Sequence, residues 1–145
     1  MDSKENITSE LERTLHLIKG RSLAIFKEKN FPISRDQWMI LERIAEQEGS
    51  NQKDIAKDTF KDPAALTRML DILVHKGFAK RQASKSDRRT FDVYLTVEGN
   101  RLVNRMRISL QELTKNISQT LTKDEQKNLT ATLTKIQNNI SLLYT

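Results

Sequence analysis

The most chemically suggestive part of this sequence is a basic stretch at residues 76–91. It holds one acidic residue, Asp87, and six cationic residues: Lys76, Lys80, Arg81, Lys85, Arg88 and Arg89. No acidic residue lies between Asp71 and Asp87. Such a concentration of Lys and Arg favours binding to a polyanion. The obvious candidate is nucleic acid, because contacts of Lys and Arg with its phosphates supply much of the affinity of proteins that bind it.

The stretch also has the pattern of a β-hairpin, with one strand at 78–83, a turn at 84–89 and a returning strand at 90–96. In the returning strand Phe91, Val93 and Leu95 alternate with Thr90, Asp92 and Tyr94, which predicts a half-buried strand with the apolar side chains on one face. Arg88 and Arg89 then lie at the hairpin tip, where packing requires no arginine.

The elements before the hairpin are predicted helices. An apolar stripe runs through residues 6–28 and ends at Phe31-Pro32. Ser34 and Gln37 form a capping box for a second helix, which is predicted to stop at Gly49, and Asn51 can cap a short third one. Asp62-Pro63 is a start signal for a fourth helix, which Gly77 should end.

The chain is therefore expected to be mainly α with a small β-hairpin wing. Helices two to four and the hairpin, residues 34–96, predict a winged helix-turn-helix domain for DNA. The helical flanks at 1–33 and 97–145 carry apolar stripes that the winged domain does not obviously need for its own core. We interpret the flanks as a dimerisation region, with an intramolecular bundle as the alternative. The residues expected to dimerise are Leu11, Leu15, Ile18, Leu129, Leu133, Ile136, Ile140 and Leu143.

In a winged helix-turn-helix the second helix of the turn motif enters the major groove, and the wing follows the backbone or enters the minor groove. The expected DNA-binding residues are Lys61, Pro63, Ala64, Thr67, Arg68, Arg81, Lys85, Asp87, Arg88 and Arg89. Three of them have a structural alternative. Thr67 can bond back to its own helix, Arg81 can pair with an acid of the same domain, and Asp87 can simply cap the turn.

Composition excludes several other classes of function. The 145 residues contain no cysteine, which rules out disulfides, thiolate metal sites and thiol redox sensing. The only histidines, His16 and His75, are far apart in the sequence, so no metal site is expected. No Ser-His-Asp set is evident and the four glycines form no phosphate loop, so neither an enzyme nor another cofactor is expected. With a net charge of +6 and neither a signal peptide nor an apolar run of membrane length, we expect a cytoplasmic protein that does not enter a membrane.

The order of motifs resembles the MarR family of bacterial transcriptional regulators. The resemblance rests on Thr67-Arg68, on Leu73 through Gly77, on Arg81, on Asp87-Arg88-Arg89 and on Leu95-Thr96-Val97-Glu98-Gly99. It implies a homodimer on a pseudo-palindromic DNA operator, often a repressor, with small ligands relieving DNA binding. It also implies that Arg89 enters the minor groove and that Asp87 orients it.

Two features depart from the family pattern. His75 stands where an acid is common, and the recognition helix opens with Asp62-Pro63-Ala64-Ala65 rather than with Ser or Thr. The family pattern therefore does not carry an operator sequence over to this chain. A module that binds DNA without sequence choice, or binds protein, is the alternative function.

An aromatic or phenolic effector would need an apolar cleft. Phe26, Phe31, Trp38 and Met39 could line one between the dimerisation helices and the winged domain. The alternative for these four residues is ordinary packing in the core, and the two roles are compatible.

Overall fold

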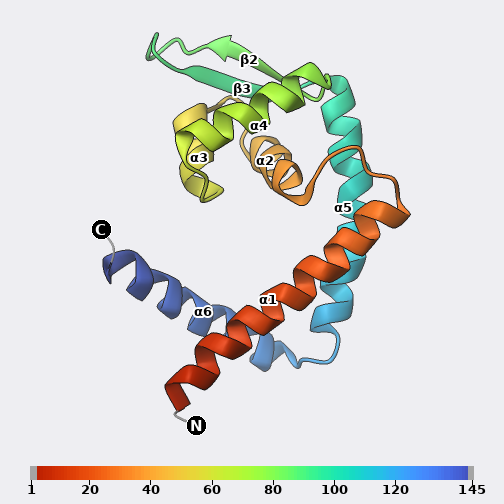
Figure 1. Cartoon of the computed structure of the whole chain (residues 1–145), viewed down its shortest axis with the longest axis vertical. Coiled ribbons are helices and arrows are strands. Elements are labelled where there is room, and N and C mark those ends of the chain that lie inside the picture. The colour runs from red at the N-terminus through yellow and green to blue at the C-terminus, as the bar shows by residue number, and fades with distance from the viewer. Residues whose placement is uncertain (1–2, 144–145) are drawn as a thin grey trace. The chain divides into compact units, whose positions relative to one another are not determined.

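The computed structural model describes residues 3–143, which form six helices and three short strands (Figure 1). In chain order these are α1 (Ser3–Glu28), α2 (Arg35–Glu46), β1 (Ser50–Asn51), α3 (Gln52–Asp58), α4 (Pro63–His75), β2 (Ala79–Ala83), β3 (Phe91–Leu95), α5 (Val97–Ser118) and α6 (Lys123–Leu143). The predicted fold class is confirmed: the chain is mainly helical, with a small antiparallel wing. None of these helices is long and apolar enough to cross a membrane.

The helix starts follow the capping signals in the sequence. At α2 the Ser34 hydroxyl accepts the Gln37 N–H at 3.2 Å, and the Gln37 side chain accepts the Ser34 N–H at 2.9 Å. At α4 the Asp62 carboxylate accepts the Ala65 N–H at 2.9 Å, with Pro63 in the first turn. Each cap satisfies a backbone donor that the helix itself leaves unpaired, which is why these boundaries are readable from sequence.

Three helices end in the same backbone motif. The residue after the cap has a positive φ, and the N–H of the following residue reaches the carbonyl oxygen five residues back, at 2.9–3.0 Å. The positive-φ residue is Asn30 after α1 (53°), Phe60 after α3 (56°) and Gly77 after α4 (83°). Gly77 was predicted at this place. Phe60 is unusual, because left-handed backbone is unfavourable for a residue with a bulky side chain.

The sheet has the order β1-β3-β2 and is antiparallel throughout. Ala79 faces Leu95, Arg81 faces Val93, and Ala83 faces Phe91 across the hairpin. The short strand β1 was not predicted. Val93 and Leu95 are buried as expected, but Phe91 is 46% exposed, because the buried cluster of the domain includes Val93 and Leu95 and stops short of Phe91. Thr90, expected on the polar face, is buried and accepts a hydrogen bond from Asn51 at 2.6 Å.

One hydrophobic core holds the helix-turn-helix and the hairpin together. It includes residues from both predicted flanks, since Phe26 of α1 and Met106 of α5 are buried in it. Its fully buried side chains come from every helix between α2 and α5 and from β3: Ile40, Leu41, Ile44, Ile55, Leu66, Leu70, Leu73, Val93, Val103 and Met106. The winged domain is therefore packed directly against the end of α1 and the first half of α5.

The chain divides into two compact units, one ending at Leu110 and the other beginning at Gln111. The second unit contains the end of α5 and all of α6. Thr122 caps α6 by accepting the Glu125 N–H at 3.1 Å. No described residue of α6 is buried, although its sequence carries a regular apolar stripe.

Candidate nucleic-acid interface

The helix-turn-helix consists of α3 and α4, joined by a turn at residues 59–62. Ile55 and Ala56 bury one face of α3, while Leu66, Leu70 and Leu73 bury one face of α4. Burial of that face leaves the other side of α4 exposed. The predicted contact residues Pro63, Ala64, Thr67 and Arg68 all lie on this exposed side.

The wing presents its cations at the hairpin tip. Lys85, Asp87, Arg88 and Arg89 are all exposed. The Asp87 carboxylate accepts the backbone N–H of Arg89 at 3.0 Å, and the carbonyl oxygen of Asp87 accepts the N–H of Thr90 at 3.2 Å. Asp87 thus caps the turn, the alternative raised from sequence, and in doing so it fixes the backbone from which the Arg89 side chain projects.

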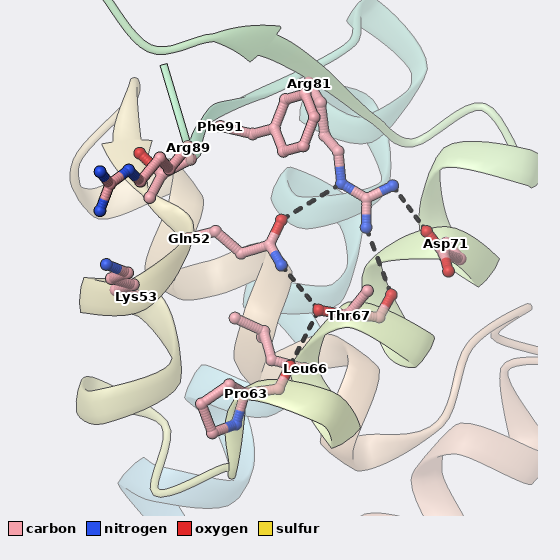
Figure 2. Close-up of a pocket in the computed structure, with 10 residues that line it drawn as sticks. Gln52, Lys53, Pro63, Leu66, Thr67, Asp71, Arg81, Arg89 and Phe91 are labelled. Carbon is pink, nitrogen blue, oxygen red and sulfur yellow. Dashed lines mark hydrogen bonds and ion pairs between the residues drawn. The ribbon is translucent and has the colours of Figure 1, made fainter. Parts of the chain in front are cut away.

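Arg81 connects the wing to the helix-turn-helix (Figure 2). Its guanidinium forms an ion pair with Asp71 of α4 at 2.7 Å and donates to the Thr67 carbonyl oxygen at 3.3 Å. Its Nε donates to the Gln52 side chain of α3 at 3.3 Å. The guanidinium therefore holds β2, α3 and α4 together, as the alternative reading of Arg81 anticipated.

The network continues from Gln52 to Thr67. The Gln52 amide nitrogen donates to the Thr67 hydroxyl at 2.8 Å, and that hydroxyl donates to the Pro63 carbonyl oxygen at 2.9 Å. Thr67 is thus exposed and also bonded back to its own helix. Gln52 was not singled out in the sequence, because a lone Gln early in a short helix gives no signal of a long-range partner.

A hollow of about 420 Å³ lies between α3, α4 and the base of the wing. Leu66 and Phe91 supply much of its apolar wall. Lys53 and Arg89 stand along one side of it, as Figure 2 shows. The partly exposed Phe91 ring therefore belongs to this concave surface, not to the closed core.

The cations of this region fall into two groups. Lys61 forms an ion pair with Asp36 of α2 at 2.7 Å, and Arg81 with Asp71. Among the residues that the structure describes, no acidic side chain pairs with Arg68, Arg88 or Arg89. Positive charge that the fold does not neutralise is therefore concentrated on the exposed face of α4 and at the wing tip.

The residues predicted for a ligand cleft are mostly packing residues. Phe26 and Trp38 are buried in the core, and Phe31 and Met39 pack against it. Phe31 meets Phe26 edge-to-face with ring centroids 5.5 Å apart, and the Arg105 guanidinium lies 5.5 Å from the Phe31 centroid. Their part in a ligand cleft stays a prediction.

The apolar side chains predicted for dimerisation are largely open to solvent. Leu11, Leu15, Leu129, Ile140 and Leu143 are exposed, with Leu143 at 68%. Ile18, Leu133 and Ile136 are half-buried. These residues lie on α1 and α6, and the described residues of the chain leave most of their apolar surface uncovered.

Three supporting contacts, one ion pair and two hydrogen bonds, could not be found from sequence. Arg43 of α2 forms an ion pair with Asp58 of α3 at 2.6 Å and donates to Ser50 at 3.1 Å. The Glu48 carboxylate accepts the Leu95 N–H at 3.1 Å. These contacts join α2 and the turn after it to α3, β1 and β3, and nothing in the sequence around Arg43 or Glu48 indicates them.

Comparison with known proteins identifies this arrangement. The sequence model of the MarR family matches residues 33–91, which contain the helix-turn-helix and most of the wing. Residues 33–91 thus match the DNA-binding domain of the MarR family. The HTH-type transcriptional regulator YwhA of Bacillus subtilis is 33% identical over 84 residues, 58% of this chain. The match spans only 60% of YwhA.

Solved structures of MarR proteins extend the similarity to nearly the whole chain. A mutant MarR from E. coli, complexed with operator DNA, is 28% identical, with 90% of this chain and 96% of that one covered and a TM-score of 0.74. The transcriptional regulator SlyA is 25% identical, with 93% and 94% covered and a TM-score of 0.82. The helices that flank the winged domain are therefore shared with MarR structures as well.

Proposed function

We propose that this chain is a sequence-specific regulator of transcription that binds double-stranded DNA through α4 and the wing, as a homodimer, and acts as a repressor. The observation that carries the proposal is the unpaired positive charge of Arg68, Arg88 and Arg89 on the exposed side of the helix-turn-helix and wing. A MarR-family protein of similar fold has been solved on its operator DNA, which supports the same use of this surface.

In the proposed complex, some contacts supply affinity and others supply sequence specificity. Lys85 and Arg88 at the wing tip contribute to affinity by neutralising phosphates, and Arg89 enters the minor groove from a backbone fixed by Asp87. Arg68 on α4 pairs with a guanine or a phosphate. Lys61 and Arg81 act by positioning α4, because their charges are already paired within the domain.

The Asp62 cap limits one further contact. The first turn of a helix is normally a site for phosphate, because its free N–H groups point outward. Here the Asp62 carboxylate already accepts the Ala65 N–H at 2.9 Å and places a negative charge at that end. We therefore assign the phosphate contacts to the wing and not to the start of α4.

Homodimerisation is proposed from the apolar surface of α1 and α6. On each of these helices, apolar side chains at helical spacing are left exposed, and exposed apolar surface of this kind favours an interface. A second copy of the chain would cover Leu11, Leu15, Leu129, Ile140 and Leu143. The two α4 helices of such a dimer would need half-sites about 34 Å apart, one turn of DNA, to reach successive major grooves.

Binding to a duplex selected from a random DNA pool tests the proposal. With roughly six to ten phosphate contacts per dimer, the affinity should fall by about 10³ to 10⁵ between 50 and 200 mM salt. Arg89→Ala should abolish binding. Arg101→Ala is the matched control, because Arg101 is an exposed α5 arginine already paired with Glu98 at 2.6 Å and its loss changes the net charge equally.

Four outcomes would contradict parts of the proposal. Affinity that is equal for selected and random DNA would make the chain a non-specific DNA-binding module. Affinity that hardly changes with salt, or that survives Arg89→Ala as well as Arg101→Ala, would remove the wing from the interface. Light scattering over a range of protein concentrations tests the dimer separately, since a monomer at every concentration would refute it.

An effector that relieves DNA binding stays a prediction from the family resemblance. A thermal-shift screen of phenolic and other small aromatic compounds, followed by DNA-binding assays with any compound that raises the melting temperature, tests it. A compound that stabilises the protein and also weakens its DNA binding is the expected result.

A further inference from the structure

The exposed start of α4 has little hydrogen-bonding capacity left for bases. Thr67 shares its helix face with Pro63 and Ala64, which lie four and three residues earlier. Pro63 and Ala64 have apolar side chains, and both are exposed. Thr67 is the only residue of the three whose side chain carries a polar group.

The hydroxyl of Thr67 is engaged on two sides. Arg81 can only donate, so it fixes the Gln52 oxygen towards itself and turns the Gln52 amide nitrogen towards Thr67, 2.8 Å away. Having accepted that hydrogen bond, Thr67 gives its single proton to the Pro63 carbonyl oxygen at 2.9 Å. The network thus uses the only proton of the hydroxyl and one of its two lone pairs, and it leaves the methyl group free.

From this geometry we infer that Thr67, with Pro63 and Ala64, recognises the C5-methyl groups of thymines in the major groove. Apolar contact with that methyl, from Ala or from a Thr methyl, is one of the direct ways in which a helix distinguishes thymine. The inference rests on the proposed function and specifies it: each half-site contains thymine where the start of α4 lies, and Arg68 supplies the polar readout beside it.

Replacement of thymine by uracil tests this directly, because it removes only the methyl group. The probe is the duplex selected from a random pool, synthesised once with thymine and once with uracil. We expect wild-type protein to bind the uracil duplex about fourfold more weakly for each methyl contacted, and about 15-fold more weakly when both half-sites are changed. The minor-groove contact of the wing should be unaffected, since the methyl lies in the major groove.

Two variants of Thr67 assign the effect to its methyl group. Thr67→Ser keeps the hydroxyl and its two hydrogen bonds but lacks the methyl, so its preference for thymine over uracil should fall. Thr67→Val keeps a methyl and loses the hydroxyl, so its preference should remain even if its overall affinity drops. For each protein the readout is the ratio of its dissociation constants for the uracil and thymine duplexes, measured by fluorescence anisotropy at one salt concentration.

The results separate this inference from the proposed function. Equal affinity for the thymine and uracil duplexes, together with strong preference over random DNA, would overturn thymine recognition and leave the regulator intact. An unchanged ratio in Thr67→Ser would overturn the assignment to Thr67. No preference of the wild type for the selected duplex over random DNA would refute the proposed function itself.

Discussion

Gly99→Ala should be among the most destabilising substitutions to a small residue in this chain. Gly99 lies in the first turn of α5 and is buried, and a Cβ added there would stand 1.9 Å from the carbonyl oxygen of Phe78 and 2.9 Å from its carbon. Ordinary van der Waals contact is 3.4–4 Å. The clash is with backbone, so no side-chain rotation can relieve it.

The size of the effect follows from what must move. The same Phe78 oxygen accepts the Thr96 N–H at 3.1 Å, and the Thr96 hydroxyl accepts the Gly99 N–H at 3.0 Å. Shifting α5 away from Phe78 weakens the first bond if Thr96 moves with the helix, or the second if Thr96 stays, at about 1 kcal/mol, and adds an overpacking cost of about 1–3 kcal/mol. After subtracting up to about 1 kcal/mol for the better helix propensity of Ala, we expect a loss of about 1–3 kcal/mol.

Urea unfolding followed by tryptophan fluorescence measures this loss. Trp38 is the only tryptophan and is 5% exposed, so its emission reports directly on the core. The midpoint should fall by about 1–2 M. Gly20→Ala is the matched control: Gly20 lies inside α1 with nothing within 4 Å of an added Cβ, so the same substitution should stabilise by about 0.5–1 kcal/mol. A Gly99→Ala midpoint within about 0.2 M of wild type would refute the reasoning.

Two further predictions concern charge and backbone strain. The pKa of Glu42 is raised, chiefly because burial disfavours the carboxylate more than Arg107, 3.9 Å away, favours it. The folded protein therefore holds this proton more tightly than the unfolded chain does, so wild type loses stability as pH rises from 4 to 7 and Glu42→Gln does not. The melting temperature of Glu42→Gln minus that of wild type should increase over this range. A difference that stays flat or falls would contradict this. Phe60→Gly should be about 1 kcal/mol more stable than Phe60→Ala in the same urea assay. Both variants lose a ring that is 93% exposed, but only Gly accepts a φ of 56° without strain. Equal stabilities would show that this backbone is not strained.

Much of the architecture could be predicted because its signals are local. The capping box at Ser34, the Asp62-Pro63 start and the Gly77 end each depend on residues within one helical turn, and all three were predicted correctly. The alternation in β3 likewise predicted the burial of Val93 and Leu95. Such features can be read from sequence because the residues that satisfy the backbone are neighbours in the chain.

The parts that could not be predicted depend on partners far apart in sequence. Strand β1 has only two residues and exists because Ser50 pairs with Val93. The exposure of Phe91 depends on where the core ends beneath the sheet, which no pattern within the strand specifies. Phe60 shows a different limit, since nothing in its type suggests the positive φ that the end of α3 imposes.

The Arg81 network shows how these long-range contacts bear on DNA recognition. A basic residue in a basic hairpin is naturally read as a DNA contact, yet Arg81 is held by Asp71, Gln52 and the Thr67 carbonyl oxygen. In the proposed complex the wing and α4 must fit adjacent grooves together, and independent motion of the two would cost conformational entropy on binding. By joining them before DNA arrives, Arg81 can raise affinity without touching DNA. By orienting Gln52 it also decides which group of Thr67 is left to contact a base.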